Sequence, residues 1–246
     1  MAYYPPPHEA MHHHHHHHHM HHPQHHHDPN NHWYRHGALA GMSSAVHEKV
    51  SNIVQNSSFL KTVPQVEIPS FDRHEIEVLP HLLGHGAFSQ VHAVTRLHVR
   101  RDDRAPQYHR KKLLAEQVAA PTTAAGGRAP YVLKHLKGDL VRNREDLENA
   151  AIDLCVEVLF LTRLDHPNII KVRGLANGWT SAFRDRHDGF FILMDRLEPL
   201  DHRIHRWRDR LHHPAARQVS LSRKISYASQ IADAVSYLHD RRIIFR

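Results

Sequence analysis

The chain has 246 residues, with 32 Lys and Arg, 25 Asp and Glu, and a formal net charge of +7 when histidine is neutral. Its single cysteine excludes an intramolecular disulfide framework and a four-cysteine zinc site. The longest apolar run, Phe190 to Met194, is far shorter than the ~20 residues of a membrane-spanning helix. Because Met1 to Ala10 lacks a basic region and an apolar region, we expect no secretory signal and a cytoplasmic or nuclear location.

Histidine dominates the start of the chain. Residues 1–36 contain 16 of the 31 histidines, and His12 to His19 form an unbroken run. Interruption of the histidine-rich stretch by Met20 and Pro23 favours native low-complexity sequence over an expression tag. With little to bury, residues 1–72 are predicted to be a disordered tail. Imidazole binds zinc, nickel and copper, but a specific site needs fixed geometry. A passive tail and a metal- or pH-responsive tail both remain open.

The basic charge would also suit nucleic acid, yet no ordered basic motif supports such a partner, and we expect none.

A short helix is predicted near 44–54 within the tail. Apolar residues alternate with polar ones in Glu75–Pro80 and Gln90–Thr95, and each segment predicts a strand. Residues 96–130 are basic and rich in Gly, Ala and Pro, which predicts a solvated insertion with at most a helical turn or two. Tyr131–Leu136 predicts a third strand.

The clearest helical pattern covers Asp146–Leu164. Apolar residues recur there at three- and four-residue spacing, and Pro167 follows the predicted end. Two short, mainly apolar segments, Ile169–Val172 and Gly189–Met194, predict buried strands. This order predicts an α+β fold in which a five-stranded antiparallel sheet carries one long helix.

A helical part is predicted to follow the sheet. His202–His212 is a basic amphipathic stretch, and Leu221–His239 has apolar residues on one side of a second long helix. Because the chain ends shortly after this helix, we expect its apolar side to lack packing partners and to face water, and we expect aggregation or partial disorder of this segment.

A glycine-rich segment lies between the first two predicted strands. It runs from Leu83 to Val91 with the pattern GxGxFSxV, in which Gly84 and Gly86 allow close backbone approach and a positive φ. An ordinary glycine turn would show the same pattern. A dinucleotide-binding fingerprint would need a helix directly after the glycines, and a Walker A loop would need a GK[ST] sequence. Neither is present.

Two charged residues stand out among apolar neighbours. Lys134 lies in the third predicted strand, and Glu157 lies in the long helix between two valines. Each could be a solvated surface residue. Because a carboxylate near an apolar stripe is costly unless it is paired, Lys134 is the natural partner of Glu157. Such an ion pair would hold the lysine ammonium where it can meet phosphate groups.

Three further segments complete a recognisable set. They are Leu164-Asp165-His166-Pro167-Asn168-Ile169-Ile170, the stretch from Phe190 to Leu197, and the stretch from Tyr237 to Arg246. With the glycine loop, Lys134 and Glu157, these segments resemble the eukaryotic protein kinases in order and spacing. The resemblance covers residues 73–246.

The resemblance implies a protein-kinase-like fold, with an N-terminal lobe at 73–197 that carries the αC helix and the start of a truncated helical lobe at 198–246. It also implies ATP and Mg²⁺ as cofactors, with the magnesium ligands beyond the chain end. Lys134 and Glu157 would be the catalytic ion pair, and Met194 would be the gatekeeper. The implied nucleotide-contacting residues are Leu83, Gly84, Gly86, Ser89, Val91, Val132, Lys134, Met194, Asp195 and Leu197.

The kinase pattern stops at the catalytic loop. Phe245 and Arg246 stand where the family has the His and Arg of HRD, so the catalytic Asp would come next. We therefore expect this polypeptide alone not to transfer phosphate, as either a fragment or a truncated regulatory product. The implied function is a serine/threonine protein kinase that moves the γ-phosphate of ATP to an unidentified protein. The alternative is a non-catalytic, pseudokinase-like binding module with a responsive histidine-rich tail.

Overall fold

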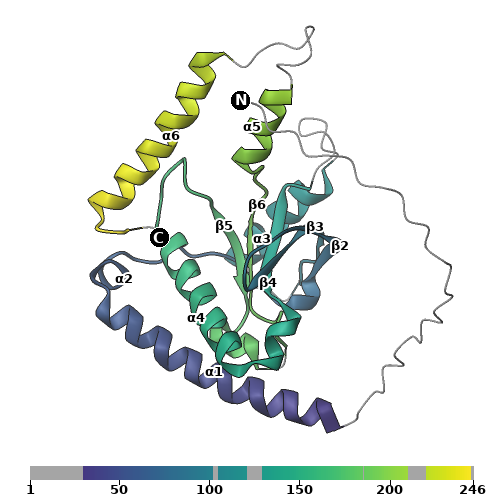
Figure 1. The fold of residues 1–246 in the computed structure, drawn as a ribbon. Coiled ribbons are helices and arrows are strands. Elements are labelled where there is room, and N and C mark those ends of the chain that lie inside the picture. The colour runs from purple at the N-terminus through teal and green to yellow at the C-terminus, as the bar shows by residue number, and fades with distance from the viewer. Residues whose placement is uncertain (1–29, 102–104, 121–128, 185, 210–219, 245–246) are drawn as a thin grey trace, which may run out of the picture.

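The computed structural model describes residues 30–101, 105–120, 129–184, 186–209 and 220–244. Within these ranges the fold is α+β, as predicted, and it contains one mixed sheet surrounded by helices (Figure 1). The strands are β1 (Ser70–Phe71), β2 (Ile76–His85), β3 (Ser89–Leu97), β4 (Tyr131–Leu136), β5 (Val172–Ala176) and β6 (Phe191–Asp195). The helices are α1 (Asn30–Asn56), α2 (Ser58–Thr62), α3 (Ala105–Ala119), α4 (Arg144–Leu161), α5 (Leu200–Asp209) and α6 (Leu221–Asp240).

The predicted count of five antiparallel strands was wrong. The sheet has six strands in the order β1-β5-β6-β4-β3-β2, and β1 pairs with β5 in parallel. Phe71 of β1 is fully buried, and its ring occupies the space above Gly174 of β5, where an added Cβ would lie 2.8 Å from the ring. Glycine at that position therefore makes room for the edge strand. The predicted strand at 169–172 is displaced, because β5 begins only at Val172.

Strand β4 lies in the middle of the sheet, between β3 and β6. It coincides with the predicted strand, and five of its six residues are buried or nearly so, in keeping with a strand covered on both faces. Leu133 and Leu136 are completely inaccessible. The central position makes β4 a rigid base for any side chain that it presents.

Helix α4 follows β4 after a short 3₁₀ helix, η2 (Gly138–Arg142). Asn143 caps its start by accepting hydrogen bonds from the N–H groups of Glu145 and Asp146. Its buried residues recur at the predicted spacing of three and four. They are Leu147, Ala150, Ala151, Leu154, Cys155, Val158 and Leu159.

Helix α1 lies within residues 1–72, which were predicted to be a disordered tail. Four of its apolar residues, Leu39, Met42, Val46 and Val50, recur every three or four residues and are at most 4% exposed. They belong to the same core as the sheet. The helix includes the short one predicted at 44–54 and is much longer. Residues 1–29, the histidine-rich part of the predicted tail, lie outside the described residues.

The basic insertion is also more ordered than predicted. Helix α3 occupies Ala105–Ala119, and its Lys111 is only 3% exposed because it pairs with Glu75. Gln117 near its end accepts a hydrogen bond from the Tyr131 hydroxyl of β4. The helix is therefore held against the rest of the fold at its middle and near its end, although residues 102–104 and 121–128 of the predicted insertion lie outside the described part of the chain.

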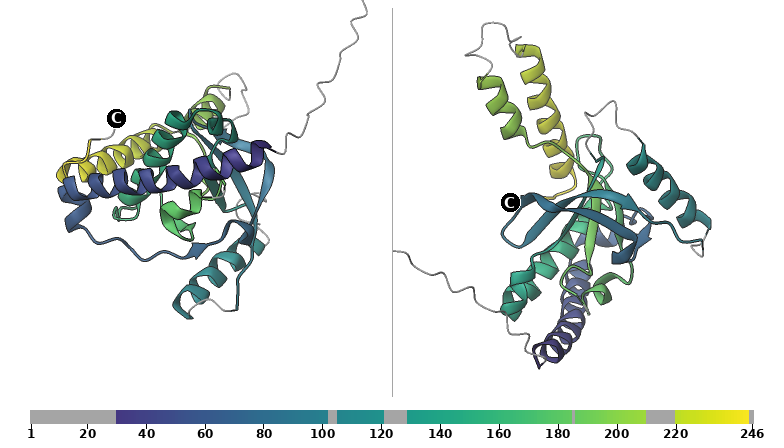
Figure 2. Two further views of the ribbon diagram at one scale, coloured as in Figure 1. Left: turned by 90° about the horizontal axis from the view of Figure 1, so that it is seen from below. Right: turned by 90° about the vertical axis from the view of Figure 1, so that its right-hand side faces the viewer.

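Helices α5 and α6 extend from the sheet at the end of β6 (Figure 2). No residue of α6 is buried, and Leu221, Ile225, Ile231 and Val235 are between 42% and 71% exposed. The predicted exposure is therefore confirmed for these four residues, whereas Leu238 on the same side is half-buried and packs against the core. Among the described helices, none has both the length and the apolar character needed to cross a membrane.

Candidate functional site

Strand β4 places Lys134 on one face of the sheet. Its register partners are Val91 on β3 and Ile192 on β6, and Val132 on the same strand is paired with Met194. Because residues two apart on a strand share a face, and because directly paired residues do too, these side chains all lie on the Lys134 face.

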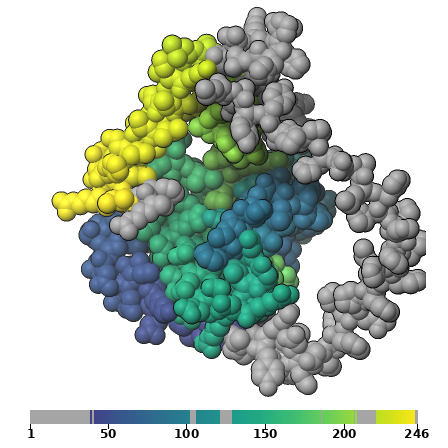
Figure 3. Space-filling model, viewed as in Figure 1, coloured from purple at the N-terminus to yellow at the C-terminus, as the bar shows by residue number. Residues whose placement is uncertain are grey.

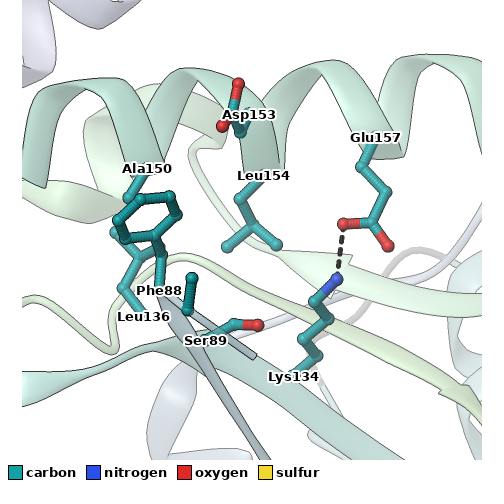
Figure 4. Close-up of a pocket in the computed structure, with 9 residues that line it drawn as sticks. Phe88, Ser89, Lys134, Leu136, Ala150, Asp153, Leu154 and Glu157 are labelled. Carbon is teal, nitrogen blue, oxygen red and sulfur yellow. Dashed lines mark hydrogen bonds and ion pairs between the residues drawn. The ribbon is translucent and has the colours of Figure 1, made fainter. Parts of the chain in front are cut away.

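Helix α4 brings Glu157 to the same place. The Lys134 ammonium lies 2.5 Å from Glu157 Oε2, and the two side chains are 20% and 37% exposed. Figure 4 shows the lysine rising from the sheet and the glutamate descending from the helix above it. The predicted ion pair is thus present, joining two elements that are 23 residues apart in the chain.

The glycine-rich segment forms the hairpin between β2 and β3. The Gly86 N–H donates to the Ser89 carbonyl at 2.9 Å, and the Lys137 N–H donates to the Phe88 carbonyl, which ties the hairpin to the end of β4. Neither Gly84 nor Gly86 adopts a positive φ, so that expectation was wrong. The space beside Gly84 is open, because a Cβ added there would meet nothing within 4 Å.

A cavity of about 170 Å³ lies between the hairpin, β4 and α4. Its lining is Ala87, Phe88, Ser89, Lys134, Leu136, Ala150, Asp153, Leu154 and Glu157. Ser89, Lys134 and Glu157 were predicted site residues. Phe88 and Asp153 were not, although Asp153 precedes Glu157 by four residues and so shares its helix face. In Figure 4 the Phe88 ring lies beside Ala150 and Leu136.

The remaining predicted residues lie outside this cavity. Val132 and Met194 are buried on the Lys134 face and Val91 is half-buried there, whereas Leu83 of β2 is half-buried and packs against the core. Leu197 follows β6 and is 63% exposed. Val91, Val132 and Met194 thus share one face of the sheet next to Lys134 without lining the cavity.

Asp195, at the end of β6, has a structural role of its own. Its two carboxylate oxygens accept hydrogen bonds from Nε and Nη2 of Arg173 on β5, at 2.8 and 2.9 Å. This bidentate contact raises the pKa of Arg173. The next residue is held as well, because the Arg196 N–H donates to the Pro130 carbonyl at 2.8 Å. Within the described chain, no backbone hydrogen bond is made by the Leu197 N–H.

Two other reactive side chains are buried away from the cavity lining. Cys155 is buried, and burial raises the pKa of its thiol, which disfavours the reactive thiolate. Burial also lowers the pKa of His135, whose ring stacks on His92 with centroids 5.2 Å apart. Among the described residues, no group of three or more His, Cys, Asp or Glu side chains is placed to hold a metal ion.

Comparisons with known proteins do not assign a family. No protein-family model matches the chain, and a search of curated proteins found no match. Functional inference therefore depends on the geometry of this site and on the resemblance carried by the motifs.

Proposed function

We propose that this chain carries the nucleotide-binding part of a serine/threonine protein kinase, which binds ATP and transfers its γ-phosphate to a protein hydroxyl. One observation supports the proposal above all others. The Lys134 ammonium, 2.5 Å from Glu157, lines a cavity directly beneath a glycine-containing hairpin. The unobstructed space at Gly84 adds to this, because it leaves the hairpin backbone open to close approach by a ligand.

The chemistry required of this part of a kinase is mainly positioning and charge neutralisation. Lys134 would place a compact positive charge against the α- and β-phosphates, and Glu157 would orient it. The Ser89 hydroxyl, on the cavity wall, would donate a further hydrogen bond to a phosphate oxygen. Magnesium would neutralise phosphate charge when bound. Its ligands, like the catalytic Asp, correspond by resemblance to positions after Arg246.

The size of the cavity fits the phosphate groups rather than the whole nucleotide. Pockets for complete small-molecule ligands usually enclose ~300–1,000 Å³, well above the 170 Å³ found here. The adenine would lie farther along the same face, against Val91, Val132 and Met194. There the Leu197 N–H would provide a backbone donor for a ring nitrogen.

Calorimetric titration of the purified chain with ATP and with ADP tests the proposal. A charge-assisted hydrogen bond contributes about 1.5–3 kcal/mol, so Lys134→Met should weaken ADP binding at least tenfold. Glu157→Gln should weaken it less, because the lysine remains. The matched controls are Lys112→Met and Glu116→Gln, which alter an exposed Lys–Glu pair on α3.

Unchanged affinity in Lys134→Met, or equal losses in the site variants and the α3 controls, would contradict the nucleotide site. A folded wild-type chain that binds neither ATP nor ADP would favour the alternative of a non-catalytic binding module. Phosphate transfer itself requires a chain that supplies the catalytic Asp, and Lys134→Met should abolish turnover there without unfolding the protein.

A further inference from the structure

A segment outside the kinase-like residues 73–246 follows α4 along most of its length. It comprises residues 39–66 of α1, α2 and the chain after them, and Figure 2 shows α1 lying across α4 when the molecule is seen from below. Near the start of α4, the Lys49 ammonium lies 2.6 Å from Glu148 Oε1. In the last turn, the Phe59 ring stacks on Phe160 with centroids 5.6 Å apart and planes 3° from parallel.

The same segment also binds the C-terminal end of α4. The Val66 N–H donates to the Thr162 carbonyl at 3.0 Å, and Arg163 Nε donates to the Val63 carbonyl at 3.0 Å. The last carbonyls of a helix have no partner within the helix, so the first of these bonds satisfies a group that would otherwise need water. Contacts at both ends oppose sliding and tilting of α4.

Helix α1 is in turn fixed to the sheet. The Ser43 hydroxyl donates to the Thr180 carbonyl at 2.8 Å, in a buried contact, and His47 Nδ1 lies 3.2 Å from the Thr180 hydroxyl. Thr180 belongs to the 3₁₀ helix η3 (Trp179–Phe183), which directly follows β5. The segment therefore connects α4 to the sheet by a route separate from the direct contact of α4 with β4, and Figure 3 shows it pressed against the rest of the molecule.

This connection bears on the candidate site because of where Glu157 lies. Glu157 precedes Phe160 by three residues, so the Phe59–Phe160 stack is within one helical turn of the ion pair. Helices that slide in regulated proteins move by about 1–2 Å, and a shift of that size would separate two atoms now 2.5 Å apart.

We propose that residues 39–66 form a positioning strap, which holds α4 so that Glu157 meets Lys134 and orients it toward phosphate. This inference depends on the proposed nucleotide site and names an element that controls it. Phe59 and Lys49 are positioning residues, because they act on the site only through α4.

The test compares ADP with adenosine, since only ADP carries the phosphates that Lys134 would contact. Phe59→Ala should weaken ADP binding three- to tenfold, no more than Glu157→Gln does, because it acts on Lys134 only through Glu157, and it should leave adenosine binding within about twofold. Phe59→Leu, which keeps an apolar side chain, should restore ADP binding. Leu97→Ala is the matched control, because Leu97 is a buried core residue at the opposite end of β3 from the glycine hairpin.

A double-mutant cycle provides the decisive comparison. If Phe59 acts through Lys134, then Phe59→Ala should change ADP affinity less than twofold in a Lys134→Met chain. Equal losses for ADP and adenosine, or the same loss in Leu97→Ala, would reduce Phe59 to a structural residue and overturn the strap. Full ADP affinity in Phe59→Ala would overturn it too. Failure of the wild-type chain to bind ADP would instead refute the proposed function, and the strap with it.

A second pair of variants serves if Phe59→Ala does not fold. Lys49→Glu places two like charges together near the start of α4 and should weaken ADP binding two- to threefold. Lys49→Glu combined with Glu148→Lys restores opposite charges and should return the affinity to the wild-type value. Absence of both the loss and the rescue would count against the strap.

Discussion

The buried ion pair between Lys111 and Glu75 joins α3 to the residue that directly precedes β2. The Lys111 ammonium lies 3.3 Å from both Glu75 oxygens and 4.8 Å from the centre of the Phe71 ring. The two charged side chains are only 3% and 2% exposed. At 3.3 Å the attraction between unit charges is about 5 kcal/mol for an effective dielectric constant near 20, and the cost of removing both charges from water offsets much of it.

Replacement of Lys111 by methionine should therefore destabilise the protein strongly. Removing one partner of a buried pair costs about 3–5 kcal/mol, because the other charge is left without compensation. Glu75 would keep the hydrogen bond from the Asp72 N–H at 2.7 Å, so we expect a loss of about 3 kcal/mol. Adding Glu75→Gln removes the stranded charge and should recover roughly 1–2 kcal/mol. The neighbouring Lys112→Met, at an exposed pair, should cost less than about 0.5 kcal/mol.

Urea unfolding followed by circular dichroism measures these free energies in the four chains. From most to least stable, the expected order is wild type, Lys112→Met, the double variant and Lys111→Met. A Lys111→Met chain within about 1 kcal/mol of the wild type would show that the pair contributes little. A double variant less stable than Lys111→Met alone would show that the uncompensated charge is not the cause of the loss.

Three other predictions concern separate regions. Burial lowers the pKa of His135, so the unfolded chain binds more protons at this residue than the folded one as the pH falls below about 6.5. The free energy of unfolding should therefore decrease over that range. In urea titrations at pH 5–7.5, His135→Gln should flatten the slope of this free energy against pH. An unchanged slope would contradict this. Cys155, buried and with a raised pKa, should react with a maleimide only after unfolding, and rapid labelling of the native chain by mass spectrometry would be inconsistent with its position. Ile231→Glu together with Val235→Lys should reduce light scattering at high concentration without lowering the melting temperature, because both side chains are exposed on α6; equal scattering would exclude this face as the cause of association.

Apolar patterns in the sequence identified the elements that position the candidate site. Strand β4 matches the segment expected for it, because its mainly apolar residues are covered on both faces of the sheet. Helix α4 lies within about three residues of its predicted limits, because its buried residues recur every three or four positions. Lys134 and Glu157 stood out as charges in apolar surroundings. The prediction that these two side chains are in contact also drew on the resemblance to protein kinases, because residue spacing alone does not tell how a helix packs on a sheet.

Other features were hidden for physical reasons. Strand β1 has two residues, too few to show an alternating pattern, and it exists because Phe71 fills the space above Gly174. In α1, the buried residues are regularly spaced, but the histidine-rich composition before them suggested disorder. Lys111 lies in a run of basic residues, and nothing in its neighbours indicates that it alone is buried. The glycine motif includes Phe88, but the direction of its side chain depends on the hairpin geometry and could not be predicted from the sequence.

Covalent labelling of Lys134 by an ATP analogue with a reactive acyl phosphate tests the central claim most directly, because the acyl group passes to an amine that lies against the phosphates. Peptide mass spectrometry of the labelled chain should find Lys134 as the preferred site, with labelling suppressed by excess ADP but not by adenosine monophosphate at the same concentration. Labelling of Lys134 no stronger than that of the exposed Lys112, or labelling that ADP does not suppress, would show that this lysine does not face a bound nucleotide.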